Sequence, residues 1–195
     1  MFSVNIDKLV EMTPTEKESY AEVVNSIVEQ SDKIKTLAIV NGGVNTFKIA
    51  YEFVRRGLKV LFIDGNIKSD TFLGKYRLGK DMDGVADYLR NPDGDYRLIC
   101  QTNQPDLNIV FTGNIGSQPL TEQERYVTKS LIREYRDVYD YIIMDADDDG
   151  SLAKYCVRTA IMVNEDEYSE NYVNSLADHL EKNGCKILGV ITAER

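Results

Sequence analysis

The stretch Thr36–Ala50, TLAIVNGGVNTFKIA, decides the fold. It opens with a continuous apolar run, which is typical of a buried strand in a parallel sheet. Gly42 and Gly43 follow, and apolar residues then recur at helical spacing from Phe47 to Val54. A strand, a glycine turn and a helix are the layout of a phosphate-binding loop, in which backbone N–H groups at the helix N-terminus face an anion. The sequence therefore predicts the geometry of such a loop.

The side chains that a working phosphate loop needs are missing from this stretch. The motif reads GxxxxGK[ST], and a glycine-rich variant reads KGGVGK[ST]. Set against that variant, NGGVNTF has no lysine at either lysine position and a phenylalanine where the magnesium hydroxyl belongs. The residues of this candidate nucleotide loop, which we expect to be degenerate, are Asn41, Gly42, Gly43, Val44, Asn45, Thr46 and Phe47.

Length and composition favour one globular domain over residues 1–195, with residues 1–13 as an N-terminal arm. The formal net charge of -9 argues against nucleic acid as a partner. Three cysteines without CxxC spacing fit a reducing cytoplasm. No apolar run reaches the ~18 residues of a membrane helix, so we expect no direct membrane insertion.

Apolar patterns and turn signals predict alternating strands and helices. The expected strands are 36–41, 59–64, 107–112, 140–145, 158–164 and 186–192. The expected helices are 14–30, 46–56, 83–91, 95–101, 121–139, 151–157 and 166–182, with a loop over 65–82. This alternation predicts an α/β fold, with a mainly parallel sheet flanked by helices on both faces.

Five local strings, in order along residues 14–195, resemble the bacterial tyrosine kinases (BY-kinases) of capsule and exopolysaccharide synthesis, which are relatives of the MinD and ParA ATPases. They are ESYAEVVNSI at 18–27, FIDGN at 62–66, TGNIGSQPLTE at 112–122, YIIMDA at 141–146 and CKILGVIT at 185–192. The resemblance implies a P-loop NTPase-like fold. It also implies that Asp64 and Asp145 are remnants of the family's catalytic carboxylates, and that Asp64, Asn66 and Asp145 stand at its metal positions.

The chain departs from the family at positions that matter. Asn66 replaces the second aspartate of the family's DGD motif, which FIDGN resembles. Asp147 and Asp148 replace the prolines that follow the family's Walker B aspartate, which is Asp145 in this chain. Ala21 and Val24 replace the two arginines of the oligomerisation motif. We therefore expect a monomer or small oligomer instead of the family's ring.

Two lysines are candidates to replace the lost phosphate lysine. Lys48 lies about 200° around the helix from the lost position, so we expect it to point away from the loop. Lys68 lies in the loop after Asp64, and we expect it in solvent.

The leading expectation is a catalytically inactive BY-kinase-like protein that acts as a regulatory or scaffolding partner in polysaccharide biosynthesis or export. We expect no cofactor. By resemblance, the partner is a membrane polysaccharide co-polymerase or an active BY-kinase relative, which would hold the cytoplasmic chain at the inner face of the membrane. One alternative is an active ATPase or tyrosine kinase that binds ATP and magnesium through unconventional ligands. Another is an interaction module without a link to polysaccharide.

Overall fold

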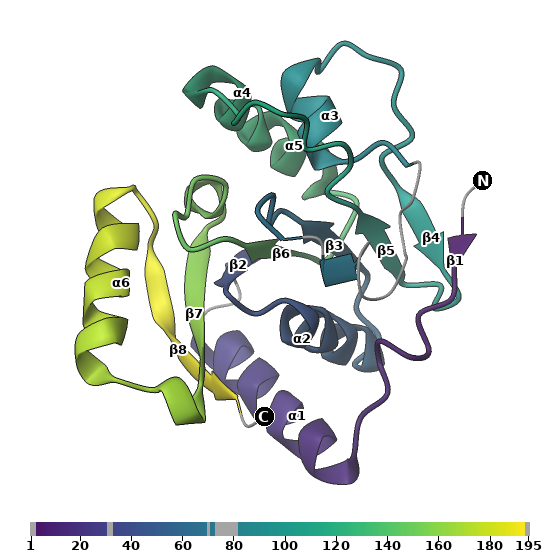
Figure 1. Cartoon of the computed structure of the whole chain (residues 1–195). Coiled ribbons are helices and arrows are strands. Elements are labelled where there is room, and N and C mark those ends of the chain that lie inside the picture. The colour runs from purple at the N-terminus through teal and green to yellow at the C-terminus, as the bar shows by residue number, and fades with distance from the viewer. Residues whose placement is uncertain (1–2, 31–32, 70, 73–81, 194–195) are drawn as a thin grey trace.

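The computed structural model describes the chain apart from residues 1–2, 31–32, 70, 73–81 and 194–195. Within the described ranges, eight strands form one sheet in the order β1-β4-β5-β3-β6-β2-β7-β8 (Figure 1). Their bounds are β1 Ser3–Val4, β2 Thr36–Val40, β3 Val60–Asp64, β4 Cys100–Thr102, β5 Leu107–Val110, β6 Tyr141–Ala146, β7 Arg158–Asn164 and β8 Ile187–Ala193. Neighbouring strands are parallel except for β4 and β5, which are antiparallel.

Helices cover both faces of this sheet (Figure 1). One face carries α1 Pro14–Gln30 and α2 Val44–Arg55, and the other carries α3 Val85–Arg90, α5 Thr128–Tyr135 and α6 Glu170–Lys182. The short helix α4 Glu122–Tyr126 leads into α5, and the 3₁₀ turns η2 Ala153–Tyr155 and η3 Glu165–Glu167 flank β7. The predicted fold class, a mainly parallel sheet flanked on both faces, is confirmed.

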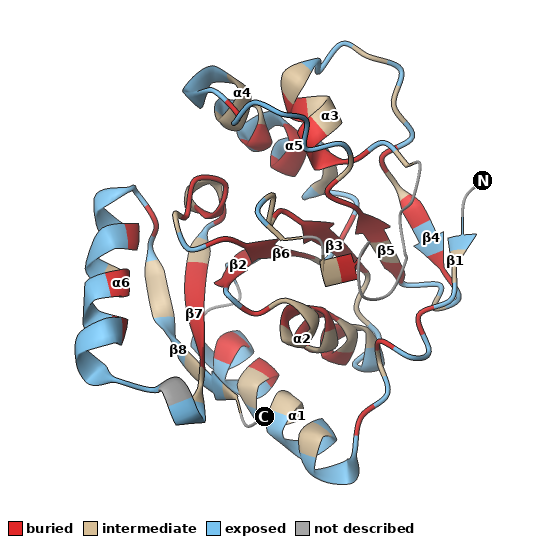
Figure 2. Cartoon of the chain, viewed as in Figure 1, coloured by how far each residue is buried: buried red, intermediate tan, exposed pale blue. Residues whose placement is uncertain are grey.

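The central strands β2 and β3 are buried at every residue, and Figure 2 shows them in red between the two helix layers. Their continuous apolar runs are what a strand covered on both faces requires. The predicted strands at 36–41 and 59–64 match these two elements to within a residue. Because β2, β3 and β6 are parallel and lie side by side, their carboxyl ends meet at one edge of the sheet.

Helix α1 packs on its own domain. A capping box begins it, in which the Thr13 N–H donates to the Glu16 carboxylate over 2.7 Å and the Glu16 N–H donates to the Thr13 hydroxyl over 3.2 Å. Val24, at one of the two arginine positions of the family, is fully buried with Ile27 in the core beneath α2. The Lys48 ammonium lies 2.8 Å from the Glu16 carboxylate and ties α2 to α1.

Three expectations about the elements need correction. The predicted helix at 95–101 is wrong, because Cys100–Thr102 forms β4 and pairs with β5. The predicted helix at 121–139 divides into α4 and α5 at Val127. Residues 3–4 of the predicted arm form β1, which pairs with β4. Part of the predicted loop at 65–82 lies outside the described residues.

No helix in the described ranges combines the length and the apolar character that crossing a membrane requires.

Candidate functional site

The connection between β2 and α2 is shorter than a phosphate loop. Strand β2 ends at Val40 and α2 begins at Val44, so only Asn41, Gly42 and Gly43 lie between them. In the aligned register the GxxxxGK motif runs from Val40 to Thr46, and α2 begins at Val44, inside that span. The structure has the predicted strand, turn and helix, but it differs from the expected loop in length. Val44 to Phe47, expected within the loop, form the first turn of α2.

The three-residue turn is tightly constrained. Asn41 and Gly43 have φ angles of 63° and 54°, in the left-handed region that glycine and asparagine tolerate best. A Cβ atom added at Gly42 would lie 2.0 Å from the Thr46 hydroxyl oxygen, so this position accepts no side chain. The glycines therefore serve a tight turn here.

The carboxylate of Asp145 lies at the N-terminus of α2. Its Oδ1 atom accepts hydrogen bonds from the Gly43 N–H and from the Thr46 hydroxyl, each over 2.7 Å. Asp145 is 1% exposed, so these bonds form away from solvent. A helix N-terminus presents unpaired N–H groups and the positive end of the helix dipole, and both favour a negative charge. The chain thus supplies its own anion at this position.

Asp64 lies beside Asp145, because the two residues are register partners on the neighbouring parallel strands β3 and β6. Burial raises the pKa of Asp64 to about 7, and the charge of Asp145 adds to the effect, while hydrogen bonds from Thr112 and from the Asn66 backbone oppose it. Burial also raises the pKa of Asp145 to about 6, against hydrogen bonds from Thr46, Gly43 and the Asn66 side chain.

The structure therefore brings Asp64, Asn66 and Asp145 together, as the resemblance implied. A metal at these positions stays a prediction of that resemblance. The described part of the chain contains no group of three or more His, Cys, Asp or Glu residues arranged to hold a metal ion.

Lys68 is not free in solvent as expected. Its ammonium lies 2.9 Å from Asp148, 3.3 Å from Asp149 and 4.0 Å from Asp147. Burial raises the pKa of Asp147 to about 7, with a further contribution from Asp149. One lysine thus faces three aspartates, so its charge is already matched. Lys48 points away from the turn and toward Glu16, as its place on the helix predicted.

The remaining residues of the predicted loop belong to the core and to the contact with α1. Phe47 is fully buried, with its ring centroid 4.9 Å from that of Phe62 and 5.8 Å from that of Phe72. The Asn45 side chain accepts a hydrogen bond of 2.8 Å from the Tyr20 hydroxyl on α1. Phe47 therefore packs in the hydrophobic core, as a buried aromatic residue ordinarily does.

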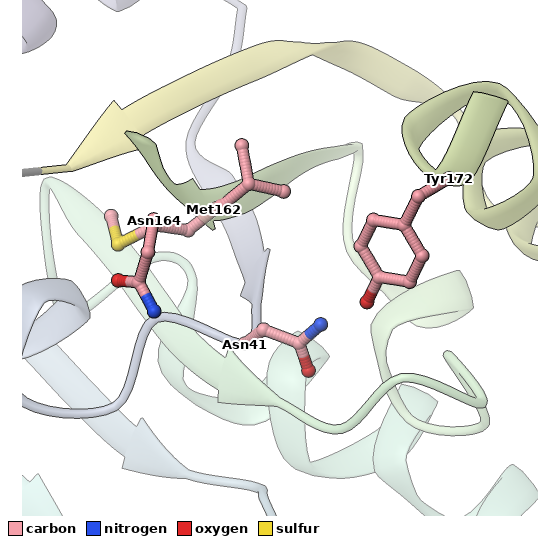
Figure 3. Close-up of a pocket in the computed structure, with 5 residues that line it drawn as sticks. Asn41, Met162, Asn164 and Tyr172 are labelled. Atoms are coloured by element: carbon pink, nitrogen blue, oxygen red, sulfur yellow. The ribbon is translucent and has the colours of Figure 1, made fainter. Parts of the chain in front are cut away.

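A pocket of about 440 Å³ lies next to the turn (Figure 3). It is lined by Asn41, Met162, Val163, Asn164 and Tyr172. Strands β2 and β7 are neighbours in the sheet. The chain leaves β2 toward β3 on one side of this pair, and it leaves β7 toward β8 on the other side. Ligands of open α/β sheets bind at such a switch point, beyond the carboxyl ends of the strands. No local sequence pattern predicts this pocket, although the ends of the predicted strands at 36–41 and 158–164 contribute Asn41 and Asn164 to its lining.

The described residues that line this pocket include no aspartate, glutamate, lysine or arginine. It offers the amides of Asn41 and Asn164 and the phenol of Tyr172 beside the apolar Met162 (Figure 3). The pocket therefore suits an uncharged hydrogen-bonding group better than a phosphate.

Comparisons with known proteins agree with the resemblance. No protein-family model matches the chain. Tyrosine-protein kinase CpsD of Streptococcus pneumoniae serotype 4 (strain ATCC BAA-334 / TIGR4) is 24% identical over 196 residues, covering 94% of this chain and 86% of the relative. The kinase domain of the Escherichia coli tyrosine kinase ETK superposes with a TM-score of 0.76 at 18% identity, over 89% of this chain and 75% of that domain.

A more distant similarity places the fold in a wider group. MinD of Aquifex aeolicus, solved in complex with MinC, superposes with a TM-score of 0.59 at 18% identity, over 81% of this chain and 68% of that chain. Similarity at this level concerns the fold, whereas the match to the kinase CpsD extends along nearly the whole sequence. In sequence and in fold, this chain is a relative of the bacterial tyrosine kinases, built on the P-loop NTPase fold.

Proposed function

We propose that this chain is a BY-kinase-like protein without kinase activity, and that it serves as a regulatory or scaffolding partner in capsular or exopolysaccharide biosynthesis or export. One observation carries the proposal. The Asp145 carboxylate accepts hydrogen bonds from the Gly43 N–H and from the Thr46 hydroxyl at the start of α2. In a phosphate loop, this end of the helix holds an anionic ligand.

Physical chemistry supports the absence of catalysis. Phosphoryl transfer depends on positioning and on neutralising the charge of the transferred group, by lysine and by magnesium. Here the turn contains Asn41, Gly42 and Gly43, and Lys68 is paired with three aspartates. The residues present therefore do not fit a nucleotide with magnesium at the start of α2. Each charge-assisted hydrogen bond contributes about 1.5–3 kcal/mol, so the loss of several removes ordinary nucleotide affinity.

The pocket at the switch point favours a second candidate function. A protein that holds a nucleotide through unconventional ligands would place an uncharged part of it against Asn41, Asn164 and Tyr172. This candidate requires saturable binding of ATP or ADP, and the leading proposal requires none. A nucleotide titration therefore separates the two.

Binding to a membrane polysaccharide co-polymerase tests the scaffolding role. The chain is mixed with vesicles that contain the co-polymerase from its own organism and with matched vesicles that lack it, with and without ATP and magnesium. We expect saturable co-sedimentation with the co-polymerase vesicles only, to the same extent with and without nucleotide, since the proposed role uses none.

A control and two contrary results complete this test. An active BY-kinase from the same organism shows that the reconstituted co-polymerase is competent to bind. If that kinase binds and this chain does not, the chain is not a co-polymerase partner and an unrelated interaction module becomes the better account. Binding that requires ATP would contradict the nucleotide-free role.

A further inference from the structure

A strip of basic side chains follows α4 and α5, on a chain whose formal net charge is -9. This basic strip consists of Arg125, Lys129, Arg133 and Arg136 along the helices and Lys154 in the neighbouring turn η2. Val127 between the two helices has helical φ and ψ angles of -60° and -24°, so the helical path continues through it. At 3.6 residues per turn, the four basic side chains on this path project within about 80° of one another. They therefore form one flank of the helix.

Carboxylates neutralise only part of the basic strip. Glu122 lies 2.5 Å from the Lys154 ammonium and 3.9 Å from the Arg125 guanidinium. Asp137 lies 3.8 Å from the Arg136 guanidinium. In the part of the chain that the structure describes, no carboxylate lies within ion-pair distance of the other two strip residues, and both are exposed. Because five basic groups face two carboxylates, the strip keeps a surplus of positive charge.

The other acidic residues of the two helices lie away from this flank. The Glu124 carboxylate accepts the Thr121 N–H over 2.6 Å and caps α4. Glu134 lies about 100° around the helix from Arg133. The positive charge is therefore concentrated on one side of α4 and α5.

Exposed aromatic rings adjoin the basic strip. Tyr126 is 57% exposed, and its ring meets that of Tyr155 edge to face, with 6.1 Å between the centroids. The Lys129 ammonium lies 5.6 Å from the Tyr126 centroid, and the Lys154 ammonium lies 5.4 Å from the Tyr155 centroid. Figure 2 shows α4, which buries no residue, largely in pale blue. Tyrosine combines an apolar ring with a polar hydroxyl, and it is enriched where proteins meet the headgroup region of a membrane.

We propose that the basic strip binds an anionic lipid surface, with α4 and α5 lying along the headgroups and Tyr126 among them. Clustered lysine and arginine side chains on a helix are attracted to anionic headgroups. The acidic remainder of the chain does not prevent this contact, because physiological salt screens charges that lie more than about 8 Å from the surface. Leu131 and Ile132 of α5 are buried in the core, so the contact is peripheral and inserts no helix.

The choice of a lipid surface over an acidic protein rests on the proposed function, which places the chain beside a membrane. The contact itself requires neither nucleotide nor co-polymerase. Its test therefore uses vesicles without protein, whereas the co-polymerase vesicles described above are made of uncharged phosphatidylcholine. The failure of one test then leaves the other interpretable.

Co-sedimentation with such vesicles measures the contact. One set contains equal parts of phosphatidylglycerol and phosphatidylcholine, and the other contains phosphatidylcholine alone. At 0.15 M salt we expect saturable binding of the natural chain to the anionic vesicles only. At 1 M salt, where the screening length falls to about 3 Å, the chain should be released.

A double variant, Lys129→Gln with Arg133→Gln, tests the strip itself. Both side chains are exposed and have no ion pair to lose, so we expect an unchanged fold by circular dichroism. Binding to the anionic vesicles should weaken about 25-fold, at about fivefold for each basic residue removed. The matched control is Lys8→Gln with Lys17→Gln, which changes the net charge equally at two exposed lysines outside the strip and should bind as the natural chain does.

Three results overturn the proposal. They are no binding of the natural chain to the anionic vesicles, equal binding to phosphatidylcholine alone, and equal binding of the strip variant and its matched control. An acidic protein as the true partner of the strip would give the first of these results.

Discussion

A variant with Asn45→Gly, Thr46→Lys, Phe47→Thr and Asn66→Asp is expected to be less stable than the natural chain and to bind no ATP. These changes restore the side chains of a phosphate loop to the positions where the sequence places them. Phe47 is fully buried against Phe62 and Phe72, and truncating a buried phenylalanine to alanine costs about 3–5 kcal/mol, part of which threonine recovers. Thr46 is also fully buried, so lysine would bring an ammonium group into the core.

The absence of binding follows from the length of the turn. Three residues connect β2 to α2, and side chains placed within α2 cannot supply the N–H groups of a longer loop. Chemical denaturation measures the loss of stability, and titration calorimetry of the folded variant measures binding. The single variant Asn66→Asp leaves the core intact and is the control for folding. A folded four-site variant that binds ATP would show that a three-residue turn is sufficient, against this account.

Replacing Asp64 by asparagine is expected to stabilise the protein at pH 8, by up to about 4 kcal/mol at ~1.36 kcal/mol per pKa unit. Burial raises the pKa of Asp64 from 3.8 to about 7, so the folded state favours its protonated form. The stabilising effect of this proton is complete below pH 3.8 and is lost as the pH rises through about 7. At pH 8 the natural chain carries a buried charge next to Asp145, and asparagine removes it.

The stabilising effect of Asp64→Asn should depend on pH. The gain in the free energy of unfolding from Asp64→Asn should be largest at pH 8 and should shrink as the pH falls toward 4. Denaturation curves between pH 4 and pH 8 measure it. Asp137→Asn is the matched control, since the Asp137 side chain is 82% exposed, and it should change stability little at any pH. A loss of stability at pH 8 in the Asp64→Asn variant would contradict this account, because it would show that the charge of Asp64 stabilises the folded state.

Local sequence patterns predicted most of the sheet. The apolar runs at 36–41 and 59–64 identify buried strands because few other structures bury every residue of such a run. Cys100–Thr102 was mistaken for a helix because a strand of three residues is too short to show alternation, and its pairing with Leu107–Val110 determines its structure. Local patterns are weakest where tertiary contacts decide the outcome.

The candidate site was predicted in part. The three predicted polar residues do lie together. Asp64 and Asp145 stand at the carboxyl ends of the neighbouring parallel strands β3 and β6, and Asn66 follows β3 and contacts Asp145. The contact between Gly43 and Asp145 joins residues 102 positions apart, and no local pattern carries such a contact. The three-residue turn was not predicted, because the apolar run ends at Val40 and the helical pattern begins only at Phe47, whereas α2 begins at Val44.

Titration calorimetry of the unmodified protein with magnesium-ATP and magnesium-ADP, each to millimolar concentration, tests the central claim most directly. If the Asp145 carboxylate holds the start of α2, as its 2.7 Å contacts with Gly43 and Thr46 indicate, we predict no saturable heat with either nucleotide. Saturable binding that Asp145→Ala abolishes would contradict the account, because Asp145 would then serve the nucleotide or its metal instead of taking the place of the phosphate.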